Sequence, residues 1–220
     1  MPDVIFEIGA DQNRSLPWSL PQNRILTLIR WWGLDGVPNT PAIPTNSASH
    51  LSPPGFHADH VGQVTSFPKA TLLIGKGDWD VLTGPKLPPA IRRPPGDIVN
   101  SEPFMNWISG GGTVEPVLLD KDVFGDSTVM MLNTPGHTPG HHVLLVKLPR
   151  TGNVLLSGDL AHFRENYNNN VVTGFNSSRA ETLASFDRVK QIAVNLKATF
   201  VIQHDPRDVD KLPAFPASAN

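Results

Sequence analysis

The sequence lacks cysteine altogether, although it is 220 residues long. This absence excludes disulfide bonds, a cysteine nucleophile and thiolate metal ligands, so any metal must be bound by imidazole and carboxylate groups. A long apolar run of the kind that spans a bilayer is missing too, and the first residues form neither a basic segment nor a cleavage signal. We therefore expect a cytoplasmic protein with no membrane partner.

An excess of positive charge is also missing. The chain has 18 lysine and arginine residues against 20 aspartate and glutamate residues, which gives a formal net charge of −2. Proteins that bind nucleic acid neutralise phosphates with basic groups, so nucleic acid is not an expected partner. The length is sufficient to bury a core without cross-links, and we expect a single domain over residues 1–220.

Proline, in contrast, is abundant, with 22 residues in the chain. Many of them gather in Pro38–Pro54 and Pro85–Pro103. Because proline fixes φ and has no amide hydrogen, such segments resist helix and sheet formation. Both segments are therefore predicted to be loops, which can form the wall of a pocket.

Short apolar runs that end at glycine, proline or charged residues predict strands. These runs are Val4–Ile8, Thr71–Ile74, Val114–Leu118, Thr128–Leu132, His142–Leu148, Val154–Leu156 and Phe200–Ile202. Helical spacing of apolar residues appears in Arg24–Trp32 and again after Ser178 and Glu181, which form a capping-box signature. This mixture predicts an α/β layered sandwich with reactive residues on loops at one edge of the sheets.

The eight histidines are concentrated in or beside a few short motifs. The densest motif is His57-Ala58-Asp59-His60-Val61-Gly62, which places three candidate metal ligands within four positions. A spacing of three residues lets His57 and His60 face one region, while Asp59 points elsewhere and can serve a neighbouring ion. In the alternative interpretation, both histidines lie on the surface and Asp59 caps a helix.

Further candidate ligands occur far away in the sequence, close to predicted strands. His137 lies in a Pro-Gly turn, Asp159 follows Val154–Leu156, and His204 follows Phe200–Ile202. Each also has a simpler interpretation, as an exposed loop histidine, a residue that terminates a strand, or a hydrogen-bonded core histidine. Their combination favours a metal site, because loops at one edge of the sheets can bring them together.

Five motifs of this chain occur in the same order in one known family. They are Ser49-His50-Leu51, His57–Gln63, Thr134–His141, Ser157-Gly158-Asp159 and Gln203–Pro206. This pattern resembles the metallo-β-lactamase superfamily, in particular its N-acyl-homoserine lactonase-like branch, and implies a four-layer αββα sandwich. The family generally has another strand pair before Val4–Ile8 and an aspartate at the position of Glu7. One hypothesis is therefore that this chain lacks the N-terminal strands.

The resemblance also implies a cofactor, namely two zinc ions per chain. One bridging carboxylate is implied, that of Asp159. The implied ligands of the first ion are His57 and His137, and those of the second ion are Asp59, His60 and His204.

The first ion has a further predicted ligand, His50. The family motif places a histidine two positions before His57, where this chain has Gly55, and the segment Ser52–Phe56 looks inserted. If this insertion bulges outward, His50 reaches the first ion. If it does not, that ion loses one ligand and is bound more weakly.

Two such ions lower the pKa of a shared water, so that hydroxide exists at neutral pH. We expect attack of this metal-bridging hydroxide on the carbonyl of a small lactone, with Asp59 or Asp159 passing a proton to the leaving group. His162 stands where related lactonases often have a tyrosine, and it is predicted to hydrogen-bond the carbonyl or to support the ligands. The candidates for an apolar pocket, or equally for ordinary core, are Phe56, Phe104, Trp107, Phe163 and Phe175.

Three alternatives stay open at this point. The same hydroxide would open a lactam or a cyclic carbamate if the leaving nitrogen were stabilised. The insertion before His57 and the short amino end would instead suit a degenerate binding member without catalysis. Finally, Trp31 and Trp32 pack either internally or against a second subunit, and in the second case the protein is a homodimer.

Overall fold

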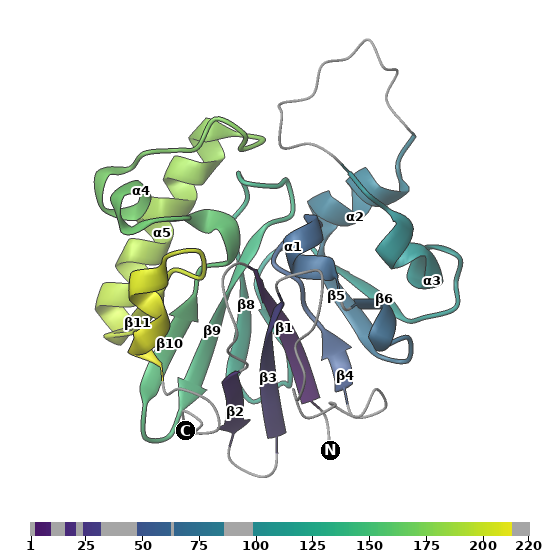
Figure 1. Ribbon diagram of the computed structural model, residues 1–220, viewed down its shortest axis with the longest axis horizontal. Helices are drawn as coiled ribbons and strands as arrows, with labels where there is room; N and C mark the ends of the chain where they lie inside the picture. Colours follow the sequence, from purple (N-terminus) through teal and green to yellow (C-terminus); the bar gives the residue numbers. More distant parts are fainter. Residues whose placement is uncertain are drawn as a thin grey trace.

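Two β-sheets lie face to face, and helices cover the outer side of each (Figure 1). The computed structural model describes residues 3–9, 16–20, 24–31, 48–62, 64–85 and 99–212, with side chains from residue 49 onward except 209 and 210. The predicted four-layer αββα sandwich is confirmed. No helix among the described residues combines the length and the apolar character needed to cross a bilayer.

The first sheet has six strands in the order β2-β3-β1-β4-β5-β6. Its neighbouring strands run parallel, except for the antiparallel pair of β2 and β3. The strands are β1 (Asp3–Gly9), β2 (Leu16–Leu20), β3 (Arg24–Trp31), β4 (Ala48–Leu51), β5 (Thr71–Gly75) and β6 (Val114–Val117). Three helices lie beside β4 to β6: α1 (Ala58–Val61), α2 (Lys76–Thr83) and α3 (Met105–Ile108).

The second sheet has five strands in the order β11-β10-β9-β8-β7. All its neighbouring strands run antiparallel except β10 and β11. The strands are β7 (Lys121–Asp122), β8 (Val129–Asn133), β9 (His142–Leu148), β10 (Gly152–Leu156) and β11 (Thr199–Val201). The helices beside it are α4 (Arg164–Asn169) and α5 (Arg179–Leu196), and the short 3-10 turns of the fold are η1 (Val64–Ser66), η2 (Glu102–Phe104), η3 (Gly158–Leu160) and η4 (Pro206–Lys211).

The alternation of side chains along the strands divides the core into three layers. Leu73 of β5 faces the second sheet and joins Leu144 and Leu156 in the inner layer, whereas Leu72 packs with Trp107 under the helices of the first sheet. The third layer lies between α5 and the second sheet. Because successive residues of a strand point to opposite faces, one continuous apolar run supplies two layers at once.

Helix α5 begins where the sequence predicts it. Ser178 is its N-cap, and the Ser178 hydroxyl accepts a hydrogen bond from the amide of Glu181 at 3.3 Å. The helix buries Phe186 and Val189 against the second sheet. The helix ends at Leu196, and the C-cap residue Lys197 adopts a left-handed conformation with φ of 50°. The prediction of an amphipathic helix packed on a sheet is confirmed.

Two predictions of secondary structure are wrong. Arg24–Trp32 was expected to be helical, but Arg24–Trp31 forms β3, which pairs with β1 on one side and β2 on the other. A short apolar run is compatible with both the helical and the strand periodicity, and hydrogen bonding to a strand on each side stabilises the strand. The loop predicted for Pro38–Pro54 contains β4, and residues 38–47 and 86–98 of the two proline-rich segments lie outside the described residues. The side chains of Trp31 and Trp32 also lie outside the description.

Candidate metal centre

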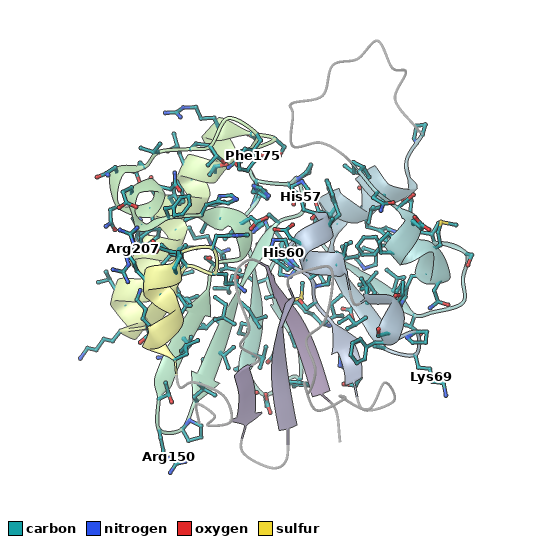
Figure 2. All side chains as sticks on the ribbon, in the orientation of Figure 1. His57, His60, Lys69, Arg150, Phe175 and Arg207 are labelled. Atoms are coloured by element: carbon teal, nitrogen blue, oxygen red, sulfur yellow. The ribbon has the colours of Figure 1, made fainter. Side chains whose placement is uncertain are left out.

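The candidate ligands come from four segments that meet at one end of the sandwich. His57 and His60 lie at α1, His137 in the loop between β8 and β9, Asp159 in η3 after β10, and His204 after β11. Figure 2 shows His57 and His60 at the same end as Phe175 and far from Lys69 and Arg150. The polar residues that follow the strands therefore occupy a common edge, as predicted for this fold class.

Helix α1 is a single turn that orients three of the side chains. His57 occupies the N-cap position, and its carbonyl accepts a hydrogen bond from the amide of His60 at 3.0 Å. The His60 side chain is fully buried, while that of Asp59 is 43% exposed. The alternative in which Asp59 caps the helix is wrong, because Asp59 lies inside the first turn.

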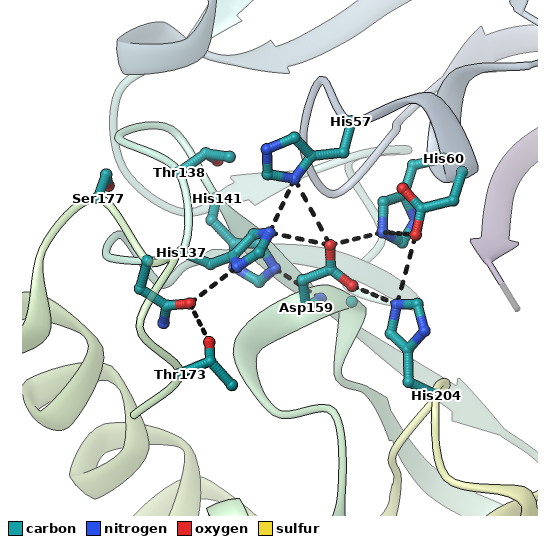
Figure 3. Close-up of polar contacts among 12 residues, drawn as sticks. His57, His60, His137, Thr138, His141, Asp159, Thr173, Ser177 and His204 are labelled. Carbon is teal, nitrogen blue, oxygen red and sulfur yellow. Dashed lines mark hydrogen bonds and ion pairs between the residues drawn. The ribbon is translucent and has the colours of Figure 1, made fainter. Parts of the chain in front are cut away.

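The carboxylate of Asp159 lies at the centre of the cluster (Figure 3). Its Oδ2 atom is 2.8 Å from His60 Nε2 and 2.9 Å from His137 Nε2, and 3.8 Å from His57 Nδ1. Its Oδ1 atom is 2.5 Å from His204 Nε2. Burial by itself would raise the pKa of this carboxyl, but His60 and His137 outweigh burial and hold the pKa well below its usual range.

The donor atoms form two groups that share Asp159. One group contains His57, His137 and Asp159, and the other contains Asp59, His60, Asp159 and His204. Within each group the donor atoms lie within 4.8 Å of one another. Imidazole nitrogens and carboxylate oxygens are the ligands that zinc takes when no thiolate is available.

The approach of His57 to His137 is a direct test of whether a cation suits the first group. His57 Nδ1 and His137 Nε2 are only 2.8 Å apart, and both also face the Asp159 carboxylate. Two ring nitrogens brought this close to each other and to an anion are well suited to a shared positive charge. The donor set of the first group therefore fits a divalent cation.

His50, which is predicted as a further ligand of the first ion, does not belong to either group. It lies on β4, where it pairs in register with Val4 and Thr71, and its ring contacts Phe124 at a centroid distance of 6.0 Å. Its Nδ1 atom is 2.8 Å from the hydroxyl of Ser49. The strand pairing holds His50 at the sheet and away from the cluster.

The reason is the course of the segment Ser52–Phe56, which is buried throughout instead of bulging outward. The carbonyl of Pro54 accepts a hydrogen bond from the amide of His142 at 3.2 Å, and the Ser52 hydroxyl lies 3.0 Å from His142 Nε2. The segment therefore passes the first residue of β9 on its way to His57. His50 lies on β4, before this segment begins. Gly55, within the segment, lies near Thr138, the residue after His137.

Two side chains, one half-buried and one fully buried, support the ligands without belonging to the cluster, and the sequence pattern did not reveal their roles. His137 Nδ1 lies 3.1 Å from the Asn176 side-chain oxygen. His141 Nε2 accepts a hydrogen bond from the amide of Asp159 at 3.0 Å, so its Nδ1 carries the proton and faces the carbonyl of Thr134 at 3.1 Å. Such contacts fix ring orientation and ligand position.

His162 lies beside the ligands. Its ring stacks on His204 at a centroid distance of 4.9 Å and is 5.5 Å from His137. Burial lowers the pKa of His162 to about 4. Phe175 packs edge-on against both His137 and His162 and is 37% exposed, so it forms an apolar surface next to the cluster.

The other pocket candidates divide into two kinds. Phe56, Phe104 and Trp107 are buried in the core under the helices of the first sheet, which is the alternative that the sequence left open. Phe163 is 50% exposed, beside His162 in the sequence. Two of these candidates have ring contacts with residues of the cluster: Phe175 with His137, and Phe56, from its buried position, with His57.

A polar clamp made of Arg164, Asp205, Arg207 and Asp208 holds the segment that carries His204. Asp205 accepts hydrogen bonds from the amide of Arg164 and from the Arg207 guanidinium, and Arg207 holds the pKa of Asp205 well below its usual range. Asp208 accepts from the Arg164 guanidinium at 2.7 Å. The clamp joins the segment after His162 to the segment after His204.

Replacing Asp208 by alanine is expected to lower the free energy of unfolding by about 2 kcal/mol. Asp208 is fully buried, and it accepts hydrogen bonds from the amide of Ile202, the guanidinium of Arg164 and the ammonium of Lys211, all of which lose this contact in the variant. Urea denaturation measures the change. The control is Asp80→Ala, which removes an exposed pair with Lys76 and is expected to cost well under 1 kcal/mol. Equal losses in the two variants would contradict the prediction.

Comparison with known proteins adds an independent line of support for this arrangement. Residues 56–196 match the family model of the metallo-β-lactamase superfamily. The N-acyl homoserine lactonase AttM of Azorhizobium caulinodans is 29% identical over 182 residues, which cover 76% of this chain and 59% of that protein. AttM of Rhizobium radiobacter is 31% identical over 161 residues, which cover 72% of this chain and 56% of that protein.

The fold is similar to that of solved structures as well. A crystal structure of an N-acyl homoserine lactone hydrolase, with the product N-hexanoyl-L-homoserine at its catalytic metal center, superimposes with a TM-score of 0.66 and 18% identity. The match covers 97% of this chain and 81% of that one. This chain therefore spans 59% and 56% of the length of the two AttM relatives and about four fifths of the solved structure.

Proposed function

The chain belongs to the metallo-β-lactamase superfamily, and on that premise we propose that it is a dinuclear metal-dependent hydrolase that opens a small cyclic ester. The observation that carries the proposal is the carboxylate of Asp159, which is shared by two groups of histidine and aspartate donors. The names of the two AttM relatives support a lactone as the substrate class.

The proposed centre takes two zinc ions, and its residues divide as the two groups do. His57 and His137 would hold the first ion, and Asp159, which belongs to both groups, would contribute a ligand to each ion. The remaining ligands of the second ion are Asp59, His60 and His204. When bound, two divalent cations polarise a carbonyl and make hydroxide available from water at neutral pH.

The protein side chains then orient the substrate and move its protons. A water oxygen bonds to the carbonyl carbon, the ring C–O bond breaks, and the departing oxygen takes up the proton that the water loses. The ring of His162 lies between Phe175 and His204, where its N–H can donate to the carbonyl oxygen. Phe175 offers an apolar surface to the part of the substrate that does not react.

Asp59 is the better placed of the two aspartates for proton transfer. Both oxygens of Asp159 already face imidazoles, at 2.5 to 2.9 Å from His60, His137 and His204. The Asp59 carboxylate lies 3.7 Å from His204 Nε2 and is 43% exposed. It can therefore reach both the reacting atoms and solvent, and we assign it the delivery of the proton to the leaving oxygen.

The experiment that tests the function combines metal analysis with matched substrates. We expect purified protein to hold two zinc ions per chain and to open an N-acyl homoserine lactone, and a chelator should remove both properties together. Protein that binds no metal and opens no lactone would instead indicate a binding member without catalysis. Faster opening of the matched lactam or cyclic carbamate would assign the substrate to that class.

Replacing His162 by phenylalanine is expected to lower kcat for the lactone by about tenfold. The phenyl ring preserves the stacking on His204 but has no N–H for the carbonyl oxygen. The loss is smaller than the roughly 10²–10³-fold cost of removing a sole oxyanion donor, because the cations share the polarisation. The matched variant His162→Gln keeps a donor and should lose less. A wild-type rate in His162→Phe, with both ions bound, would rule out this role.

A further inference from the structure

A buried carboxylate outside the cluster touches the loop that carries His137. Asp78 lies in the first turn of α2 and is 1% exposed. Its Oδ2 atom accepts a hydrogen bond from the Thr138 hydroxyl at 2.8 Å, across 60 positions of sequence. Its Oδ1 atom accepts from the amide of Gly140 at 2.7 Å, across 62 positions. Each carboxylate oxygen therefore accepts a hydrogen bond from a different residue of the same turn.

Glycines allow this contact to be made between backbones. A Cβ atom on Gly75 would lie 1.8 Å from the carbonyl oxygen of Gly140, and one on Gly77 would lie 2.6 Å from the carbonyl carbon of Pro139. A Cβ atom on Gly140 would lie 2.4 Å from the amide nitrogen of Asp78. Any side chain at these positions would push α2 away from the turn, so the close approach depends on all three glycines.

The other side of the same turn is held by the segment before α5. The amide of Ser178 donates to the carbonyl of Gly136 at 2.9 Å, and the amide of Ser177 donates to the carbonyl of His137 at 3.1 Å. His137 therefore stands between two anchors, with Asp78 on the side toward α2. A shift of the Asp78 anchor would turn the His137 ring away from His57, from which it is separated by only 2.8 Å.

We propose that Asp78 is a positioning residue that holds the turn from Thr138 to Gly140 and thereby keeps His137 directed at the first ion, a role that rests on the proposed metal centre. Burial raises the pKa of Asp78 to about 7, against the hydrogen bonds from Thr138 and Gly140, which lower it. The two hydrogen bonds to the turn after His137 compensate for the burial of this carboxyl group. The first group has three donors and the second has four, so the first ion is the more sensitive to a misdirected ligand.

The test uses two pairs of variants in the full-length chain. Thr138→Val removes the hydroxyl that donates to Asp78 at nearly constant volume, and Thr138→Ser keeps it. Asp78→Ala removes both contacts, and Asp78→Glu keeps a carboxylate. Zinc affinities for both ions are measured by competition with a chelator. In folded Thr138→Val we expect the affinity for the first ion to fall about tenfold and the affinity for the second ion to change less than about twofold. Both affinities of Thr138→Ser should be close to those of the wild type.

A readout that needs no metal separates this inference from the proposed function. In metal-free protein, NMR contacts between the rings of His57 and His137 report how His137 is directed, and hydrogen exchange reports on the amide of Gly140. We expect both signals to weaken in Thr138→Val and in Asp78→Ala. A wild-type protein that binds no zinc would refute the metal centre, whereas unchanged ring contacts and unchanged affinities in both variants would refute the positioning role.

Discussion

Asp159→Ala is expected to lose both zinc ions and to open a lactone at least about 10³-fold more slowly than the wild type. Asp159 belongs to both donor groups, so one substitution removes a ligand from each. A zinc site with four ligands binds with roughly 10–16 kcal/mol, which is about 3 kcal/mol for each ligand and about 10²-fold in affinity for each ion. Because the affinity for both ions falls together, few chains hold two ions at micromolar zinc.

Elemental analysis and the rate of lactone opening measure the two effects on the same sample. The matched control is Asp122→Asn, because Asp122 accepts hydrogen bonds from the amides of Gly125 and Ser127 in a surface loop away from the ligands. This control should keep two ions and the wild-type rate. If Asp159→Ala retained one ion at full affinity, Asp159 would not be a bridging ligand, and the two groups would have to be separate sites.

Most of the cluster could be predicted from the sequence because its members stand in short motifs next to strands. Strand ends in a layered sheet meet at one edge, and this does not depend on the length or conformation of the loops between them. His60, His137, Asp159 and His204 therefore meet in the structure, although 144 positions separate the first from the last. Continuous apolar runs also predicted the strands that are buried on both faces. In β5, for example, Leu72 and Leu73 pack in two different layers of the core.

Where prediction failed, contacts distant in sequence decided the outcome. The apolar spacing of Arg24–Trp31 fits a helix, and only pairing with β1 and β2 makes it a strand. The direction taken by Ser52–Phe56 depends on hydrogen bonds to His142, some 90 residues later. The contact between Asp78 and Thr138 has no local signature, because the residues around Asp78 do not indicate a partner 60 positions away.

Gly55→His is expected to tighten binding of the first ion by about 10²-fold. The first group has three donors, and a fourth ligand is worth about 3 kcal/mol. Gly55 has room for a side chain, because an added Cβ would lie 3.5 Å from the Thr138 side chain, an ordinary van der Waals contact. Because the buried segment Ser52–Phe56 runs toward the cluster, an imidazole at this position starts beside the loop of His137.

Gly55→Ala is the control, because it adds the Cβ atom and restricts the backbone without supplying a donor. Chelator competition should show a tighter first ion in Gly55→His alone, with the second ion unchanged in both variants. The same measurement on His50→Ala should match the wild type, since strand pairing keeps His50 at β4 and outside both groups. Equal affinities in Gly55→His and Gly55→Ala would mean that the first ion is held elsewhere than between His57 and His137. A weakened first ion in His50→Ala would mean that the segment Ser52–Phe56 rearranges to deliver His50 when metal binds.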